Sequence, residues 1–184
     1  MSKPKVFVTR KIFQEYLDLI DSKTDMELWE EELPPSRDIL LEKSKGVDGI
    51  LCLLTDAIDA EFMDAAGSQL KVVSQIAVGY NNIDVAEATR RKIPVGYTPD
   101  VLTNTTADFT FALLMAGARR ISEAYKFVQE SSWKTWHPLH FLGQDIYGST
   151  LGIVGMGRIG YEVARRATGF DMKIIYYDIN RRPD

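Results

Sequence analysis

The sequence has one cysteine, Cys52, among 184 residues, so an internal disulfide is excluded and a reducing compartment is favoured. It has no run of Lys or Arg, and its formal net charge is −4, which argues against a nucleic-acid-binding surface. The longest apolar run, within residues 109–118, is too short to span a bilayer, and the N-terminus lacks the apolar core of a signal peptide. We therefore expect a soluble cytoplasmic protein with no nucleic-acid partner, no membrane contact and no metal site.

Short apolar segments alternate with helical patterns over the first hundred residues, which predicts a parallel α/β layer. The first helix is expected to present an apolar face through Phe13, Tyr16, Leu17 and Ile20. Later helices are expected to begin after Pro34-Pro35-Ser36, after Asp59 and at the capping box Asp84-x-x-Glu87. Helices should also end near Gly46 and Gly67. The predicted strands are 5–9, 26–29, 49–54, 71–78 and 95–98.

Residues 98–100, Thr-Pro-Asp, break this alternation and indicate a domain crossing. The segment 103–120 then predicts one helix that is apolar on nearly every face over residues 109–116, so it should be buried on most sides. A further helix is expected near residues 122–130. Residues 131–147 are irregular and rich in large side chains, and a subunit contact through Trp133–Phe141 is favoured over simple coverage of the core.

The stretch 150–178 has the order strand, glycine turn, helix, strand and acid. Gly155 is expected to permit the tight turn, Gly157 to let a pyrophosphate approach the backbone, and Gly160 to let helix and strand pack closely. The helix is expected to bury a face made by Ile159, Val163, Ala164 and Ala167, and to close at Gly169. A dinucleotide site is favoured over an ordinary strand-helix-strand turn, because all five features occur in the right order.

The acid at the end of the second strand bears on the choice of coenzyme. Asp178 lies about 20 residues beyond the glycines, where its carboxylate can bond ribose hydroxyls and repel a 2′-phosphate. Arg181 and Arg182 follow closely and could instead bind that phosphate. NAD is favoured over NADP.

Four motifs together resemble the D-isomer-specific 2-hydroxyacid dehydrogenase family, and within it the glyoxylate and hydroxypyruvate reductase branch. They are QIAVGYNNID (75–84), YTPDVLTNTTADFTFALLMAGARR (97–120), WHPLHFLG (136–143) and the GMGRIG turn (155–160). The resemblance covers Lys5 to Pro183 and corresponds to the N-terminal portion of a family member. It implies a flavodoxin-like substrate-binding domain over residues 1–100, followed over residues 101–184 by the first, incomplete part of a Rossmann coenzyme domain.

The resemblance also implies residue roles. The loop at Val78 and Gly79 would present backbone N–H groups to the substrate carboxylate, and Leu54 and Thr55 would line the same pocket. Thr106 would lie beside the coenzyme. Family members are commonly homodimers that act on small 2-keto and 2-hydroxy acids. The residues expected along the coenzyme diphosphate are Gly155, Met156, Gly157, Arg158, Ile159 and Gly160.

The family's catalytic arginine, glutamate and histidine have no match among these 184 residues, so no catalytic residue is assigned. His137 and His140 precede the glycine turn and do not match the catalytic histidine; an interface or loop role is favoured for them. The polypeptide alone is expected not to reduce glyoxylate or hydroxypyruvate, whether it is a true fragment or part of a longer enzyme. The alternatives are a non-catalytic nucleotide-binding or protein-interaction module and, less favoured, a formate-oxidising relative.

Overall fold

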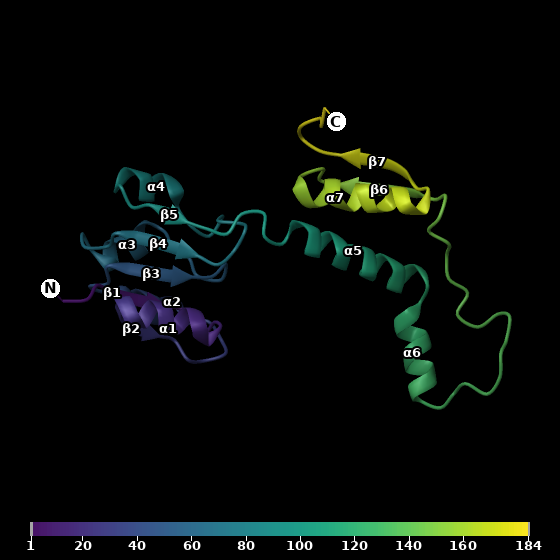
Figure 1. Cartoon of the computed structure of the whole chain (residues 1–184), viewed down its shortest axis with the longest axis horizontal. Helices are drawn as coiled ribbons and strands as arrows, with labels where there is room; N and C mark the ends of the chain where they lie inside the picture. The colour runs from purple at the N-terminus through teal and green to yellow at the C-terminus, as the bar shows by residue number, and fades with distance from the viewer. Residues whose placement is uncertain (1, 184) are drawn as a thin grey trace. The chain divides into compact units, whose positions relative to one another are not determined.

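The computed structural model describes residues 2–183, and the chain divides into two compact units, Met1–Asp100 and Val101–Asp184. Each unit has its own parallel sheet and its own buried core. The first unit runs from β1 to β5 and the second from α5 to β7 (Figure 1). The alternation of strands and helices confirms the α/β fold class.

The first unit is built on a five-stranded parallel sheet with the strand order β2-β1-β3-β4-β5. This is the flavodoxin-like order, in which the topological switch point lies between β1 and β3. The predicted fold of this part of the chain is therefore confirmed. The elements are β1 (Lys5–Val8), α1 (Gln14–Lys23), β2 (Asp25–Leu28), α2 (Arg37–Ser44), β3 (Gly49–Cys52), α3 (Ala60–Ala66), β4 (Val72–Gln75), α4 (Val85–Arg90) and β5 (Val95–Gly96).

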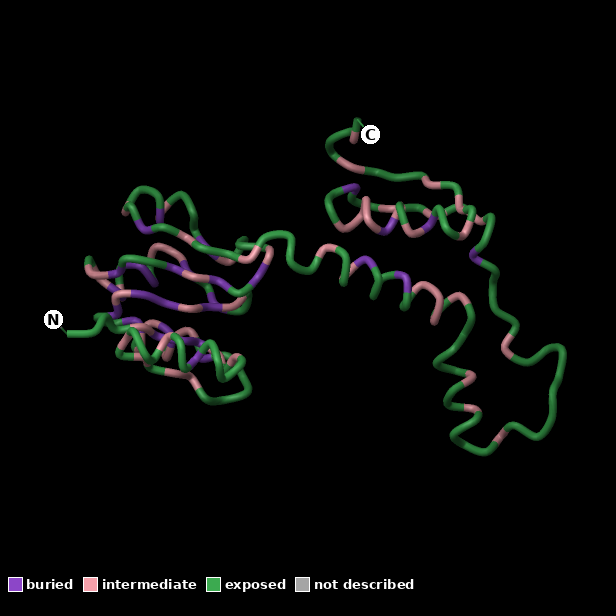
Figure 2. Tube along the Cα trace, viewed as in Figure 1, coloured by how far each residue is buried: buried purple, intermediate pink, exposed green. Residues whose placement is uncertain are grey.

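The core of this unit lies along the central strands and the helices that cover them (Figure 2). Phe7, Ile50 and Val73 come from β1, β3 and β4, and Phe62 and Met63 come from α3; all five are at most 2% exposed. Burying a side chain of this size contributes about 2 kcal/mol, so the central strands give the loops at their ends a stable frame.

Polar caps set where three helices of this unit begin. Ser36, Asp59 and Asp84 each accept the backbone N–H of the residue three positions later, as the sequence predicts. Gly67, with a left-handed φ of +89°, ends α3, a conformation that favours glycine over other residues.

The predicted capping box of α4 is only half formed. Asp84 caps Glu87 N, but the Glu87 carboxylate accepts hydrogen bonds from Arg90 and Arg91, at 2.5 and 2.7 Å, instead of from the backbone of Asp84. These two guanidinium groups lower the pKa of Glu87 to about 2. The backbone N–H of Asp84 donates to Ile58 O, so the box has no donor left to satisfy.

The first helix differs from the prediction. Phe13 is its N-cap and is 78% exposed, Tyr16 is 51% exposed, and Leu17 is the buried residue of α1. Within the first unit, α1 therefore buries a stripe that includes Leu17 rather than a broad apolar face.

Two central strands are shorter than predicted, because their ends turn into loops held by side chains. The predicted strand 49–54 ends at Cys52, since the backbone N–H of Leu53 donates to the Asp56 carboxylate at 2.8 Å rather than to a neighbouring strand. The predicted strand 71–78 ends at Gln75, after which Ile76 N donates to Cys52 O at 3.1 Å and Ala77 O accepts from Thr98 N at 3.0 Å.

The second unit contains a two-stranded parallel sheet and the helices α5, α6 and α7. β6 pairs with β7 in a register that runs from Thr150↔Lys173 to Val154↔Tyr177. α5 and α7 pack on each other around Ala107, Phe111, Val163 and Ala167, and the Phe111 ring stacks on Phe170 at 5.5 Å. The elements are α5 (Thr103–Ala118), α6 (Ile121–Gln129), β6 (Thr150–Val154), α7 (Arg158–Ala167), the 3-10 turn η1 (Thr168–Phe170) and β7 (Lys173–Tyr177).

The expectation that α5 is buried on most sides is wrong for this structure. Ala107 and Phe111 are buried, whereas Phe109 and Leu113 are 63% and 58% exposed. The reason is geometric: within its own unit the helix has α7 and the end of the 3-10 turn on one face only. The sequence shows that α5 is apolar all round but not which surfaces cover it.

The end of α7 also differs from the prediction. The helix ends at Ala167 with Thr168 as its C-cap, and Gly169 lies inside the following 3-10 turn. Asp171, with a φ of +52°, takes the left-handed position that the sequence assigns to glycine. Asp is tolerated there because its short polar side chain can satisfy local backbone groups. On the buried face, Val163 and Ala167 are buried as expected, while Ile159 and Ala164 are half-buried.

Candidate functional site

The turn between β6 and α7 uses its three glycines for three different physical reasons. Gly155 has a φ of +92°, and its N–H donates to Tyr177 O at 2.8 Å, so the turn closes tightly on β7. A Cβ on Gly160 would overlap the Gly155 carbonyl oxygen and lie 3.4 Å from Ile153 Cγ2. A Cβ on Gly157 would meet nothing within 4 Å among the described residues, so this glycine leaves open space above the backbone.

The open space lies at the N-terminus of α7. The helix begins at Arg158 with Gly157 as its N-cap, and this cap provides no side-chain acceptor for the first turn. A helix N-terminus carries a partial positive charge and backbone N–H groups that suit a phosphate. Ile159 is half-buried in the same turn, and Met156, just before it, is 8% exposed. The arrangement can hold a diphosphate.

The acid after β7 lies against this turn. Asp178 Oδ2 accepts the backbone N–H of Met156 at 2.6 Å, and Oδ1 accepts that of Asn180 at 3.0 Å. These backbone donors lower the pKa of the Asp178 carboxyl, first the N–H of Asn180 and then that of Met156. The carboxylate is therefore ionised at neutral pH, and each oxygen keeps a second lone pair for a hydroxyl donor.

The two arginines that follow Asp178 are placed differently. Arg182 stacks over the Tyr161 ring at 3.9 Å, and its Nη1 donates to Met156 O at 3.4 Å. Arg181 is exposed. Thr106 is half-buried in the first turn of α5, where its N–H donates to Leu102 O at 2.8 Å. The structure thus brings Arg182, rather than Arg181, to the glycine turn.

A second open backbone lies in the first unit, at the carboxyl end of β4. The backbone N–H groups of residues 77–82 donate no hydrogen bond to any of the residues that the structure describes. Successive unpaired N–H groups in a loop can bind an anion where their directions converge. Ligands of open parallel sheets bind beyond the carboxyl ends of the strands, near the switch point. This loop, next to the end of β3, is therefore a candidate anion site.

The loop after β3 lies directly beside it. A Cβ on Gly79 would lie 3.8 Å from Leu54 Cδ2, which is ordinary van der Waals distance. Leu54 is 54% exposed, and Thr55 is exposed with its hydroxyl accepting a hydrogen bond from Arg10 Nη2 at 2.8 Å. The structure therefore brings Leu54 and Gly79, two of the four predicted substrate residues, into one place.

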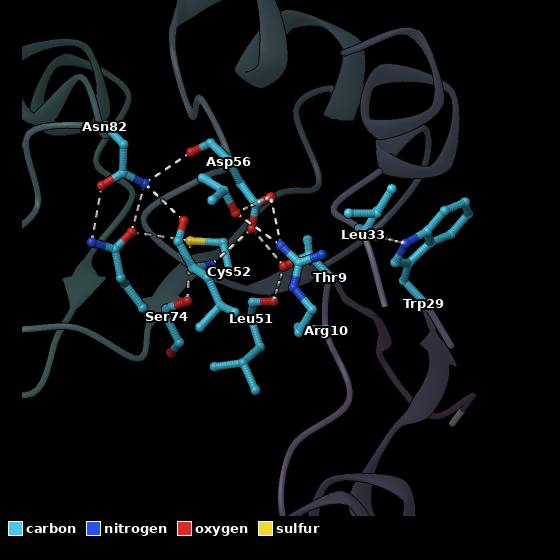
Figure 3. Close-up of polar contacts among 12 residues, drawn as sticks. Thr9, Arg10, Trp29, Leu33, Leu51, Cys52, Asp56, Ser74 and Asn82 are labelled. Atoms are coloured by element: carbon cyan, nitrogen blue, oxygen red, sulfur yellow. Dashed lines mark hydrogen bonds and ion pairs between the residues drawn. The ribbon is translucent and has the colours of Figure 1, made fainter. Parts of the chain in front are cut away.

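A buried polar network connects the segments that follow β1 and β3 (Figure 3). Asp56 is 2% exposed, and its Oδ2 accepts the Thr9 hydroxyl at 2.6 Å and the Leu53 N–H at 2.8 Å. Arg10 Nη2 lies 4.0 Å from Asp56 Oδ1, and Arg10 Nη1 is buried with no hydrogen-bond partner among the described residues. Sequence reasoning missed this network, although its members follow the ends of β1 and β3, where such polar groups meet.

The single cysteine belongs to the same region but has no reactive character. Cys52 is fully buried at the end of β3, and its Sγ lies 3.4 Å from Ser74 O. Burial, and to a lesser extent the charge of Asp56, raise the pKa of the thiol to about 12. Cys52 is therefore a core side chain and not a nucleophile, because the thiolate, which is the nucleophilic form, is not populated at this pKa.

The aromatic segment 131–147 is irregular, as predicted, and much of it is exposed. Trp133 and Trp136 are 60% and 76% exposed. The rings of His137 and His140 stack at 4.6 Å, and His140 meets the Phe127 ring edge-on at 5.5 Å. The segment packs on α6 while leaving large apolar area free.

Residues 2–183 contain neither a cluster of metal-ligating side chains nor a membrane-spanning helix. None of them forms a group of three or more His, Cys, Asp or Glu side chains that could hold a metal ion. No helix in residues 2–183 is both long and apolar enough to cross a membrane.

Comparison with known proteins gives consistent matches. The model of the family described as D-isomer specific 2-hydroxyacid dehydrogenase, catalytic domain, matches residues 6–172. A glyoxylate reductase from Korarchaeum cryptofilum is 57% identical over 183 residues, which are 99% of this chain and 55% of that protein. One from Thermococcus gammatolerans is 51% identical over 186 residues, with coverage of 99% and 55%.

A solved structure agrees with these matches. The crystal structure of the TT0316 protein from Thermus thermophilus has a TM-score of 0.89 and 41% identity, and the match covers 97% of this chain and 57% of that one. The chain thus spans about half the length of the relatives it matches. The resemblance carried by the four sequence motifs is confirmed.

Proposed function

The chain belongs to the D-isomer specific 2-hydroxyacid dehydrogenase family, and from this membership we propose that the enzyme built on it reduces a small 2-keto acid, glyoxylate or hydroxypyruvate, to the D-2-hydroxy acid with NAD(P)H. The observation that carries the proposal is the open backbone at Gly157, at the uncapped start of a helix that follows a parallel strand. The names of the glyoxylate reductases that match the chain support the choice of substrate.

The coenzyme is proposed to lie along the second unit, where it would supply the hydride. The ionised Asp178 carboxylate would accept the ribose hydroxyls and repel a 2′-phosphate, so NAD is favoured over NADP. Thr106 is proposed to lie beside the coenzyme, and Arg181 near the ribose. The diphosphate is proposed to follow Gly155, Met156, Gly157, Arg158, Ile159 and Gly160.

The substrate is proposed to bind in the first unit, at the loops after β3 and β4. The open N–H groups at Val78 and Gly79 would hold its carboxylate, and Leu54 and Thr55 would line one side. The carboxylate is the group that glyoxylate and hydroxypyruvate share, so the amides would fix the molecule by that end and leave the keto carbon free to react.

The proposal predicts that the whole enzyme oxidises NADH when glyoxylate or hydroxypyruvate is added, with a higher kcat/KM for NADH than for NADPH. The loss of coenzyme absorbance measures the rate, and an intact mass identifies the polypeptide assayed. The 184-residue polypeptide, assayed beside it, is expected to give no turnover, since no catalytic arginine, glutamate or histidine is assigned within it.

Three other outcomes would contradict parts of this proposal. NADH binding without turnover by the whole enzyme would favour a non-catalytic module. Formate oxidation in place of keto-acid reduction would favour the formate-oxidising alternative. Robust turnover by the verified 184-residue polypeptide would show that the catalytic groups lie within it.

We further propose that the protein is a homodimer that pairs through Trp133–Phe141. A large, exposed aromatic side chain is a common anchor of protein interfaces. Trp136→Ala is expected to weaken the dimer by about tenfold or more in sedimentation experiments, because burying an indole can contribute about 2 kcal/mol or more. Phe13→Ala is a matched control, since Phe13 is 78% exposed against 76% for Trp136 but lies outside the segment. An unchanged dimer in Trp136→Ala would remove Trp136 as the anchor.

We propose a cytoplasmic location because Cys52 is a free thiol. The thiol is free and fully buried in the core of the first unit, which suits a compartment in which thiols stay reduced.

A further inference from the structure

We propose that Gln75 and Asn82 are positioning residues of the substrate site: together they fix the loops after β3 and β4, and Gln75 sets the direction of the Gly79–Tyr80 peptide. The inference rests on the proposed function, because it assigns the two amides to the site that would hold the substrate carboxylate. Neither side chain need touch the substrate, so both would act through the backbone they hold.

The two side chains form a closed amide pair. Asn82 Nδ2 donates to Gln75 Oε1 at 2.7 Å, and Gln75 Nε2 donates to Asn82 Oδ1 at 3.0 Å. Gln75 is 2% exposed at the end of β4. A buried amide is costly unless its donors and acceptors are paired. Here each amide satisfies the other, so the pair has one well-defined geometry and resists rotation.

Asn82 joins the loop after β4 to the loop after β3. The other Nδ2 hydrogen is shared between Asp56 O at 2.8 Å and Leu53 O at 3.1 Å (Figure 3). Both acceptors belong to the loop that carries Leu54 and Thr55. One side chain therefore sets the spacing between the two segments that are proposed to surround the substrate.

Gln75 acts on the loop after β4 itself. Its Nε2 donates to Gly79 O at 2.5 Å, which turns that carbonyl toward the end of the sheet. In a trans peptide the C=O and the following N–H point in opposite directions, and the described residues contain no cis peptide. The N–H of Tyr80 must then point away from Gln75, and like those of Val78 and Gly79 it donates to none of the described residues.

The chemistry requires an amide at position 75. Gln75 Nε2 has two hydrogens, and its two acceptors are Gly79 O and Asn82 Oδ1. A carboxylate of the same shape would place an acceptor against both of these oxygens. The Gly79–Tyr80 peptide would lose the bond that holds its direction and would be repelled, while the fold of β4 would keep its backbone ladder.

The test compares Gln75→Glu and Asn82→Asp with wild type in the whole enzyme. Each variant is expected to raise the KM for the keto acid about tenfold or more, because loss of a well-placed hydrogen bond that orients a binding loop weakens binding by that order. The KM for NADH is expected to stay within about twofold, because the glycine turn belongs to the other unit. A merely structural role would lower both affinities or only the melting temperature.

Gln69→Glu is the matched control. Gln69 Nε2 also donates to a backbone carbonyl of the first unit, Ala66 O at 2.6 Å, but at the end of α3 rather than in the loops after β3 and β4. The same substitution there removes the same kind of bond and should leave the keto-acid KM unchanged. An equal rise in the control would show that any loss of stability in this unit raises the KM, and would overturn the inference.

If Gln75→Glu fails to fold, Asn82→Asp decides, because it keeps the size of the side chain and its acceptor for Gln75 while losing the donors to the loop after β3. A folded variant whose keto-acid KM stays within about twofold of wild type overturns the inference. Failure of the proposed function is a different result, since it would appear as wild-type enzyme without keto-acid turnover.

Discussion

Gly160→Ala is expected to destabilise the second unit by about 3 kcal/mol, because overpacking against rigid backbone is among the costlier substitutions. The added Cβ would overlap the Gly155 carbonyl oxygen and lie 3.1 Å from the Gly155 carbonyl carbon. These are backbone atoms of a turn closed on β7, so no side-chain rotation can relieve the contact. Equilibrium unfolding in denaturant, followed by circular dichroism, measures the loss.

Gly157→Ala is the matched substitution, three residues earlier in the same turn. Gly157 has an ordinary φ of −69°, and its Cβ would meet nothing within 4 Å among the described residues. Stability is therefore expected to change by less than about 0.5 kcal/mol. If a pyrophosphate approaches this backbone, the methyl group should weaken NADH binding by about tenfold or more in a fluorescence titration. Unchanged NADH affinity in a folded Gly157→Ala would place the diphosphate elsewhere.

The turn between β6 and α7 could be predicted from the sequence because its glycines are constrained by nearby backbone. Gly155 and Gly160 are five positions apart, and the constraint on each one is set by backbone within the same strand-turn-helix unit. The acid at the end of β7 follows the same logic, because parallel pairing of β6 and β7 places Asp178 beside the turn. Local geometry of this kind fixes the spacing of the glycines and the acid along the sequence.

The support beneath the substrate loops could not be predicted in the same way. Thr9 and Asp56 are 47 positions apart, and Asn82 reaches 29 positions back to Leu53. The strand order β1-β3-β4 brings them together, and polar residues at single strand ends give no periodic pattern that would identify a partner.

The faces of α5 show a second limit. Its composition predicts burial on most sides, but Phe109 and Leu113 are exposed within the second unit. The composition of an apolar helix indicates how much of its surface should be buried. Which segments bury that surface depends on the rest of the fold. The exposed rings of Trp133 and Trp136 are a similar case, because exposure alone does not name the surface that meets them.

Asp56→Ala is expected to destabilise the first unit by about 3–4 kcal/mol, because the carboxylate is buried and accepts two short hydrogen bonds. The substitution would leave the Leu53 N–H without its acceptor, which lies at 2.8 Å in the intact protein. The Thr9 hydroxyl would lose its 2.6 Å bond and keep only the longer one to Leu51 O at 3.3 Å. It would also remove the nearest carboxylate from Arg10, whose Nη1 is already buried without a hydrogen-bond partner in the described part of the chain. The guanidinium would keep its hydrogen bond to the Thr55 hydroxyl at 2.8 Å, so loss of the acceptor shared by Thr9 and Leu53 accounts for most of the cost.

Two comparisons separate this network from ordinary surface charge. Asp56→Asn keeps one oxygen acceptor and should lose about half as much stability as Asp56→Ala. Asp48→Ala removes a carboxylate that pairs at 2.7 Å with Lys71, whose side chain is 73% exposed, and that accepts the Lys5 N–H at 2.9 Å. It should cost about 1 kcal/mol, because the ion pair is screened by water and one hydrogen bond is lost. Equal losses in Asp56→Ala and Asp48→Ala would show that burial of Asp56 adds nothing. A large loss in Asp56→Ala alone would instead identify a buried anchor at the end of β3, on which the position of Leu54 and Thr55 depends.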